Sequence, residues 1–405
     1  MVRLPAFLVA PLALVTVAAH AAPADRDGER VVERAVLLMR HGVRAPLSDP
    51  AMPAGTAAAT WPAWPVPRAH LTPHGRAAVA ALGVADRTAI GLRPAPGCPD
   101  VATVRIVADN DQRTIETGRA WAAGFAPGCD LSPTALPAGE VDPVFAPVEA
   151  MGAGFDTAAA RRAVERRLPR GGFATLDART APLRARLDTI LCGRAGMPNC
   201  GVSRRPTALR PVRPGREPAL VGAIADGAKA AQILTLEYAD GMAAPGWGRL
   251  RSGDVAMLGA LRAVAYDVVY RTPYVARAFG GPTLRRMLDG IEGVDAPRLT
   301  VMIGHDSNIA AVAGLLDLHW RVPGFAADDP PPSGAIVMQL IRDRRGHRFV
   351  RMIFRSPTLD QIRAGGALSA DGATARPIAI PGCAPTPFAC PLDRFRRLVS
   401  AVLAP

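Results

Sequence analysis

Lysine is almost absent from this sequence of 405 residues: Lys229 is the only one, although lysine and arginine together number 48. Arginine therefore carries the positive charge, and 35 acidic residues leave a formal net charge of +13. Aromatic residues amount to only 5%, and the arginines are scattered. Proteins that bind nucleic acid with such a charge commonly show basic runs together with aromatic side chains for stacking. The composition argues against a nucleic-acid partner.

Charged residues are scarce as well, at 20%, whereas hydrophobic residues reach 49%. Disordered chains show the opposite balance, so the composition argues against a disordered chain. Glycine and proline are abundant, with 39 and 40 residues, which predicts many loops between short elements. The length suits one large domain or two of moderate size.

Long apolar runs are missing except at the N-terminus. There an apolar stretch over residues 4–18 follows a single arginine, and residues 19–21 (AHA) resemble a cleavage site with small residues. Two prolines interrupt the stretch, which is too short to span a bilayer. We therefore predict a signal peptide over residues 1–21, with an N-terminal membrane anchor as the alternative. The mature protein is expected in the periplasm or outside the cell, with no further membrane contact.

Export predicts that the six cysteines form disulfides, because disulfides persist in oxidising compartments. Their even number leaves many pairings open, and pairing between neighbours in the sequence is the simplest. It joins Cys98 to Cys129, Cys192 to Cys200, and Cys383 to Cys390. A zinc site is the competing interpretation, but the sequence has no C-x-x-C motif and no histidine close to these cysteines.

Short apolar runs predict strands that are buried on both faces. Three of them, at residues 35–39, 103–108 and 299–303, are each followed by polar residues, and the second and third lead into helical patterns. Such runs are typical of a parallel sheet covered by helices. Two further strands, at residues 335–341 and 349–354, flank a turn and predict a late hairpin.

The pattern changes between about residues 150 and 278, where helical spacing dominates and no convincing strand occurs. The helices are expected at residues 157–168, 183–191, 220–238 and 255–270. We therefore predict an α/β protein, in which a three-layer α/β/α domain with a mainly parallel central sheet is interrupted by a helical insert. The α/β catalytic domain is assigned residues 22–149 and 279–405, and the insert residues 150–278.

Arginine and histidine follow two of the predicted strands. Residues 40–46 (RHGVRAP) come after the first strand, and Gly304-His305-Asp306 comes after the third. Because parallel strands bring their carboxyl ends to one edge of a sheet, both sets are expected to line one crevice. Arg113, near the start of the helix after the second strand, can join them.

Several arginines around a histidine suit a ligand with more than one negative charge. Guanidinium groups bind phosphate oxygens in pairs and keep their proton. A histidine that attacks phosphorus requires such cations, because they stabilise charge on the equatorial oxygens, and Asp306 can supply the proton that the leaving oxygen needs. An Arg-His pair or a His-Asp pair alone is more often structural, so the prediction of phosphoryl transfer rests on their combination.

The combination of RHGVRAP with a late Gly-His-Asp resembles the histidine acid phosphatases, and most closely their bacterial periplasmic phytases and glucose-1-phosphatases. The aspartate after His305 separates the chain from the phosphoglycerate mutase branch of the superfamily. Further similarities, which extend the resemblance over nearly the whole mature chain, lie at residues 61–66 (WPAWPV), 71–73 (LTP), 111–114 (DQRT), 246–248 (GWG) and 305–310 (HDSNIA).

The resemblance implies a role for each of these residues. His41 would accept the phosphoryl group, and Asp306 would protonate the leaving alcohol. The phosphate would be bound by Arg40, Arg44, Arg113 and His305. No metal or other cofactor is implied, and we expect a monomer that acts on small phosphomonoesters at acid pH. A phosphate-binding protein and a phosphomutase on the same scaffold are the alternatives. The presence of His41 and Asp306 argues against the first, and export argues against the second.

The substrate remains open, because the chain departs from the phytase pattern. The phytases carry a lysine soon after RHGxRAP, where this chain has Leu47-Ser48-Asp49, closer to the neutral pair of glucose-1-phosphatases. An acidic residue of the family's insert helix is replaced by Gln232, whereas residues 242–248 look phytase-like. We predict a broad phosphatase that hydrolyses sugar phosphates and also degrades phytate.

Overall fold

The computed structural model of this protein describes residues 30–92, 97–100, 103–366, 368, 372–386 and 388–404. The predicted signal peptide over residues 1–21 lies outside the described residues. Within the described part of the chain, no helix is long and apolar enough to cross a membrane.

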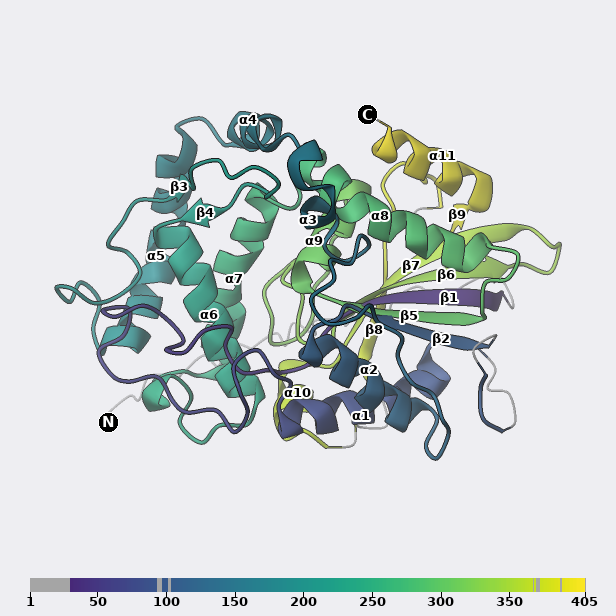
Figure 1. Cartoon of the computed structure of the whole chain (residues 1–405), viewed down its shortest axis with the longest axis horizontal. Helices are drawn as coiled ribbons and strands as arrows, with labels where there is room; N and C mark the ends of the chain where they lie inside the picture. Colours follow the sequence, from purple (N-terminus) through teal and green to yellow (C-terminus); the bar gives the residue numbers. More distant parts are fainter. Residues whose placement is uncertain are drawn as a thin grey trace, which may run out of the picture.

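A mixed sheet forms the centre of the molecule (Figure 1). Its parallel part runs in the order β2 (Val104–Ala108), β5 (Leu299–Gly304) and β1 (Val31–Arg40). Beyond β1 the sheet continues with antiparallel strands: β6 (Ala335–Arg342), β7 (Arg348–Ser356) and β8 (Thr374–Ile378), with β9 (Cys390–Pro391) also on β7. All five predicted strands are confirmed, including the late hairpin of β6 and β7.

Helices cover both faces of the sheet and complete the three layers (Figure 1). One face carries α1 (Pro73–Ala89) and α2 (Gln112–Phe125), and the other carries α8 (Pro273–Glu292), α9 (Asp306–Leu316) and α11 (Leu392–Leu403). Val36 and Leu38 of β1 share a core with α8 and α9, whereas Leu37 and Met39 share a core with α1 and α2. Burial on both faces explains the continuous apolar sequence of β1. The α/β prediction is confirmed.

The segment between residues 150 and 278 is mainly helical, as expected. Its helices are α4 (Thr157–Arg167), α5 (Gly172–Cys192), α6 (Ala223–Ala239) and α7 (Ser252–Val268). Shorter elements at its start and within it are α3 (Pro147–Met151), η1 (Gly152–Gly154) and η2 (Pro245–Gly248), and α10 (Leu359–Ala364) lies later in the chain.

Two short strands in this segment were not predicted. β3 (Ala208–Leu209) and β4 (Leu220–Val221) pair antiparallel, so the helix expected from residue 220 begins instead at Ala223. Gly222 separates β4 from α6, because its φ of 83° is incompatible with a right-handed helix. A Cβ at this position would also lie 2.1 Å from the carbonyl oxygen of Pro206.

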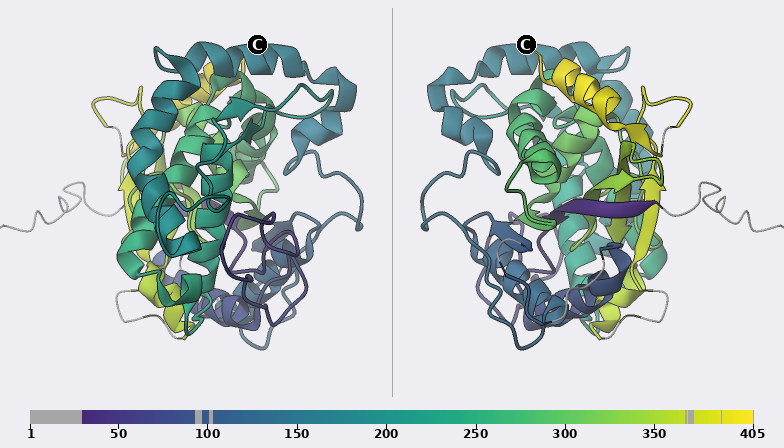
Figure 2. Two further views of the ribbon diagram at one scale, coloured as in Figure 1. Left: turned by 90° about the vertical axis from the view of Figure 1, so that its left-hand side faces the viewer. Right: turned by 90° about the vertical axis from the view of Figure 1, so that its right-hand side faces the viewer.

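The helical insert packs directly against the sheet domain. Leu187, Leu234 and Leu258 from α5, α6 and α7 belong to the same hydrophobic core as Val36 of β1. Figure 2 (left) views the insert helices from their own side of the molecule. The predicted domain limit at residue 278 falls inside α8, which runs without a break through that position.

All three predicted disulfides are present. The Cα–Cα distances are 5.4 Å for Cys98–Cys129, 6.0 Å for Cys192–Cys200 and 5.2 Å for Cys383–Cys390, which is the usual range. Pairing between sequence neighbours is confirmed, and a zinc site on these cysteines is ruled out because each of the six is already bonded.

Candidate active site

The register of β1 and β5 brings the two predicted histidines together. Arg40, the last residue of β1, is aligned with Gly304, the last residue of β5, so that His41 and His305 follow side by side. The His41 N–H donates to the Gly304 carbonyl at 3.0 Å, and the centroids of the two imidazole rings are 5.7 Å apart. Both histidines therefore lie at the carboxyl ends of the parallel strands, where a ligand is predicted to bind.

His41 is held with one ring nitrogen free. The side chain is 2% exposed, and Nδ1 lies 2.8 Å from the carbonyl oxygen of Gly42, so Nδ1 carries a proton and donates it. Nε2 then keeps its lone pair. Burial, followed by repulsion from three neighbouring guanidinium groups, lowers the pKa of His41 well below its ordinary value. The imidazole is therefore neutral and able to act as a nucleophile even in mildly acid solution.

Three guanidinium groups face this histidine. Arg40 and Arg44 are buried and each donates to a backbone carbonyl, while Arg113 pairs with Asp111 at 2.6 Å. Their Nε–H groups are buried without a hydrogen-bond partner among the described residues. Each such unpaired donor costs about 1–3 kcal/mol. Burial, together with its guanidinium neighbours, lowers the pKa of Arg44 to about 9. An anion bound here would accept hydrogen bonds from the unpaired donors and would reduce the repulsion between the guanidinium groups.

Asp306 stands beside this cationic group at the start of α9. Its Oδ2 lies 3.1 Å from Nη2 of Arg40, 3.1 Å from Nη2 of Arg262 and 3.0 Å from Nε2 of Gln232. Burial raises the pKa of Asp306, but the two guanidinium groups outweigh it and hold the pKa well below its ordinary value. In the free site Asp306 is therefore a carboxylate, which has to gain a proton before it can donate one.

Arg262 and Gln232 show that the insert contributes to the site. Arg262, on α7, is 3% exposed and also contacts the buried carboxylate of Asp329, with Nε 3.2 Å from Oδ1. The charges of Arg40 and Arg262 thus balance those of two carboxylates, Asp306 and Asp329. Sequence reasoning missed Arg262 and Asp329, because neither belongs to a motif and the chain is rich in arginine.

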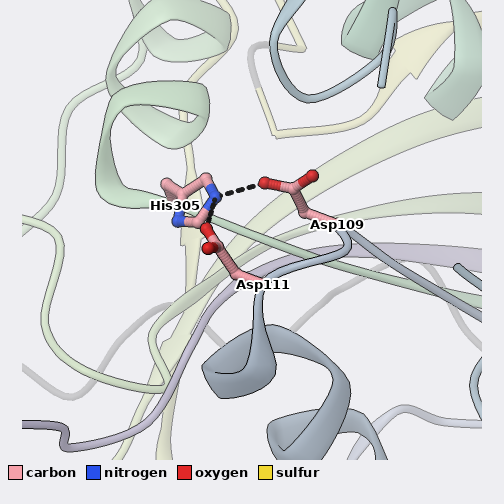
Figure 3. Close-up of side chains that lie close together, drawn as sticks. All are labelled: Asp109, Asp111 and His305. Carbon is pink, nitrogen blue, oxygen red and sulfur yellow. Dashed lines mark hydrogen bonds and ion pairs between the residues drawn. The ribbon is translucent and has the colours of Figure 1, made fainter. Parts of the chain in front are cut away.

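His305 is fixed by two carboxylates (Figure 3). Its Nε2 lies 2.6 Å from Oδ2 of Asp109 and 3.5 Å from Oδ2 of Asp111. One ligand atom from each of the three residues lies within 4.8 Å of the others, close enough to hold a metal ion. These atoms are already engaged with one another, however, and Asp111 also pairs with Arg113 at 2.6 Å. The arrangement orients the His305 ring without requiring a metal.

Two cavities adjoin the site. One, of about 340 Å³, is lined by Ala45, Ser48, Trp61, Trp64 and Arg68, among others. The other, of about 380 Å³, reaches His305 and Ser307 and extends to residues of the segment between β2 and α3 and of the insert. Each cavity is larger than a phosphate ion, and the two lie next to the site at His305 and at the segment that follows Arg44.

A buried neutral histidine, ringed by guanidinium groups and adjoined by a carboxyl group, is the arrangement of a phosphoryl-transfer enzyme. Residues 31–159 and 229–355 match the histidine phosphatase superfamily (branch 2), and these two ranges contain all six predicted site residues. The chain belongs to branch 2 of this superfamily, and it is an enzyme of the histidine acid phosphatase type, a phosphoric monoester hydrolase.

Individual relatives agree with this assignment. The chain is 31% identical over 384 residues to the phytase AppA of Escherichia coli K12, with 88% of each chain covered. It is 27% identical over 388 residues to a glucose-1-phosphatase of Salmonella typhimurium, covering 91% of this chain and 92% of the other. A solved structure of Hafnia alvei phytase in complex with tartrate has a TM-score of 0.84 at 31% identity, with 93% of this chain and 98% of the other covered.

Proposed function

We propose that this enzyme is an exported acid phosphomonoesterase that hydrolyses inositol and sugar phosphates through a phosphohistidine intermediate. The observation that carries the proposal is the state of His41, whose Nδ1–H is bonded to the Gly42 carbonyl and whose Nε2 is free beside unpaired guanidinium donors. A nucleophile in this position turns one difficult displacement into two easier ones.

In the first step, the lone pair of His41 Nε2 attacks phosphorus and the bond from phosphorus to the ester oxygen breaks. Asp306 gives its proton to that oxygen, and the alcohol leaves. In the second step, water attacks the phosphohistidine, its proton passes to Asp306, and the N–P bond breaks to release phosphate. Arg40, Arg44, Arg113 and His305 bind the phosphoryl oxygens through both steps.

The proton on Asp306 is supplied together with the substrate. Arg40 and Arg262 hold the carboxylate ionised in the free site, but a bound phosphate shares the charge of Arg40 and reduces its effect on Asp306. Phosphate monoesters have a second pKa of about 6, so in acid solution the ester itself brings a proton into the site. This mechanism favours activity at acid pH.

The relatives support the substrate class, and features of the chain itself support the location. A structure of Hafnia alvei phytase in complex with myo-inositol hexakis sulphate, at 31% identity and a TM-score of 0.82, supports inositol polyphosphates as ligands. The glucose-1-phosphatase relative supports sugar phosphates. Three disulfides and the predicted signal peptide favour the periplasm or the exterior of the cell.

The test is a comparison of kcat/KM for phytate, glucose 1-phosphate and p-nitrophenyl phosphate, measured as release of inorganic phosphate. We expect all three to be hydrolysed, with phytate preferred by less than about a hundredfold, because the phosphate-binding arginines serve every substrate. Binding without phosphate release would favour a phosphate-binding protein. Transfer of the phosphoryl group between positions of a sugar without net release would favour a phosphomutase.

A further inference from the structure

The sole lysine of the chain lies at the rim of the active site. Lys229 is an exposed residue of α6, and its Nζ is 3.4 Å from Oγ of Ser48. Ser48 belongs to the segment after β1 and follows Arg44, a phosphate-binding residue of the proposed mechanism, by four positions. A cation therefore stands beside Ser48 although the segment after β1 lacks a lysine of its own, because the insert supplies one.

The place of Lys229 on α6 relates it to the proton donor. Residues three apart on a helix are neighbours on its surface, with Cβ atoms about 5–6 Å apart, so Lys229 lies next to Gln232. The amide of Gln232 is 3.0 Å from Oδ2 of Asp306. Lys229 thus lies about one helical turn along α6 from Gln232, the residue whose amide contacts the proposed proton donor.

No carboxylate among the described residues neutralises Lys229, and its ammonium group contacts the Ser48 hydroxyl. Asp226, three residues earlier on α6, is paired with Arg205 at 3.0 Å. Asp49, next to Ser48, makes no ion pair with Lys229 in the described structure. The ammonium group is therefore available to an anionic ligand.

We propose that Lys229 binds a second phosphate group, carried by the leaving alcohol, and so favours substrates with more than one phosphate. The inference rests on the proposed function of the same site. Lys229 contacts Ser48, and the cavity lined by Ser48, Trp61 and Trp64 has room for a bulky polyol. A lysine is a point charge on a flexible stem, which suits phosphate groups at variable positions better than a rigid guanidinium fork does. Such a charge acts mainly on binding and discrimination between substrates.

Glucose 1-phosphate and glucose 1,6-bisphosphate provide the test, since they share the scissile group and differ only in the second phosphate. Release of glucose from the first and of glucose 6-phosphate from the second reports hydrolysis at C1. We expect Lys229→Gln to lower kcat/KM for the bisphosphate about tenfold, mainly through KM, and to change that of the monophosphate less than about twofold. Lys229→Arg should retain most of the preference for the bisphosphate.

Arg166→Gln is the matched control, because it removes one positive charge from an exposed position of α4, outside the elements that form the site. It should leave the ratio of the two kcat/KM values unchanged. An equal effect of Lys229→Gln on both substrates, or an equal shift of the ratio by Arg166→Gln, would overturn the role of Lys229 while the phosphatase function stands. If the wild type hydrolysed neither substrate, the proposed function itself would be contradicted.

Discussion

At the residue scale, the proposed proton donor is also a tightly held anion. Oδ2 of Asp306 has two guanidinium nitrogens and one amide nitrogen within 3.1 Å, so the carboxylate is strongly stabilised in the free enzyme. General acid catalysis requires the opposite protonation state. The two facts agree if Asp306 becomes protonated only when phosphate is bound. The contribution of Asp306 to the rate should then be largest for leaving groups that need a proton.

Asp306→Asn is therefore expected to slow poor leaving groups selectively. An alkoxide needs its proton in the transition state, whereas p-nitrophenolate leaves almost unaided, and general acid catalysis contributes about 10²–10⁴-fold. We expect kcat for glucose 1-phosphate to fall by about this factor and kcat for p-nitrophenyl phosphate to fall far less. The measurement is the ratio of the two rates in the variant and the wild type. An equal loss on both substrates would mean that Asp306 positions the site and donates no proton.

The sequence indicated these residues to different degrees. His41, His305 and Asp306 are recognisable because they follow buried strands and belong to short motifs. Arg262 and Asp329 are brought together only by the packing of α7 against the sheet domain, and no local pattern marks them. The contact of Lys229 with Ser48 likewise joins residues 181 positions apart.

At the scale of elements, prediction succeeded where burial fixes a regular pattern. β1, β2 and β5 were found because strands covered on both faces are continuously apolar. It was less complete for α5, of which only residues 183–191 were expected: Pro182 lies inside the helix and obscures the pattern before it. β3 and β4 have two residues each and exist only through their mutual pairing, so their sequences contain no period that could be detected.

Helix α6 contains a buried acid that links the stability of the fold to pH. Glu237 is completely buried and accepts a hydrogen bond from the Gly246 N–H at 2.8 Å, while its Oε1 has no hydrogen-bond partner in the described part of the chain. Burial, only partly offset by this hydrogen bond, raises its pKa to about 7. Because the folded pKa lies above the unfolded value, the folded state binds more protons, and stability is lost as pH rises from about 4.5 through 7.

Glu237→Gln is expected to remove this loss. The amide keeps an acceptor for Gly246 and cannot ionise, so the variant should resemble the wild type at pH 4 and be more stable by about 2–3 kcal/mol at pH 8. Urea denaturation at a series of pH values measures the difference in unfolding free energy. A difference that stays constant between pH 4 and pH 8 would show that Glu237 does not titrate in this range.

At the scale of the whole molecule, the site joins two parts of the chain with different tasks. The sheet provides the proposed nucleophile and the proposed phosphate-binding groups through the ends of β1, β2 and β5. The insert provides Gln232 and Arg262 around Asp306, and Lys229 at the rim. We propose that the chemistry of the scissile phosphate belongs to the sheet domain, while selection of the leaving alcohol belongs to the insert.

The central claim is that His41 carries the phosphoryl group during turnover. The most direct measurement mixes the enzyme with a phosphomonoester, denatures it within one turnover under alkaline conditions, and locates the phosphoryl group by mass spectrometry of peptides. The account predicts a base-stable, acid-labile phosphohistidine at residue 41, and none in His41→Ala, which should fold normally and lose essentially all turnover. Turnover of His41→Ala within about tenfold of the wild type, or a phosphoryl group on a different residue, would contradict it.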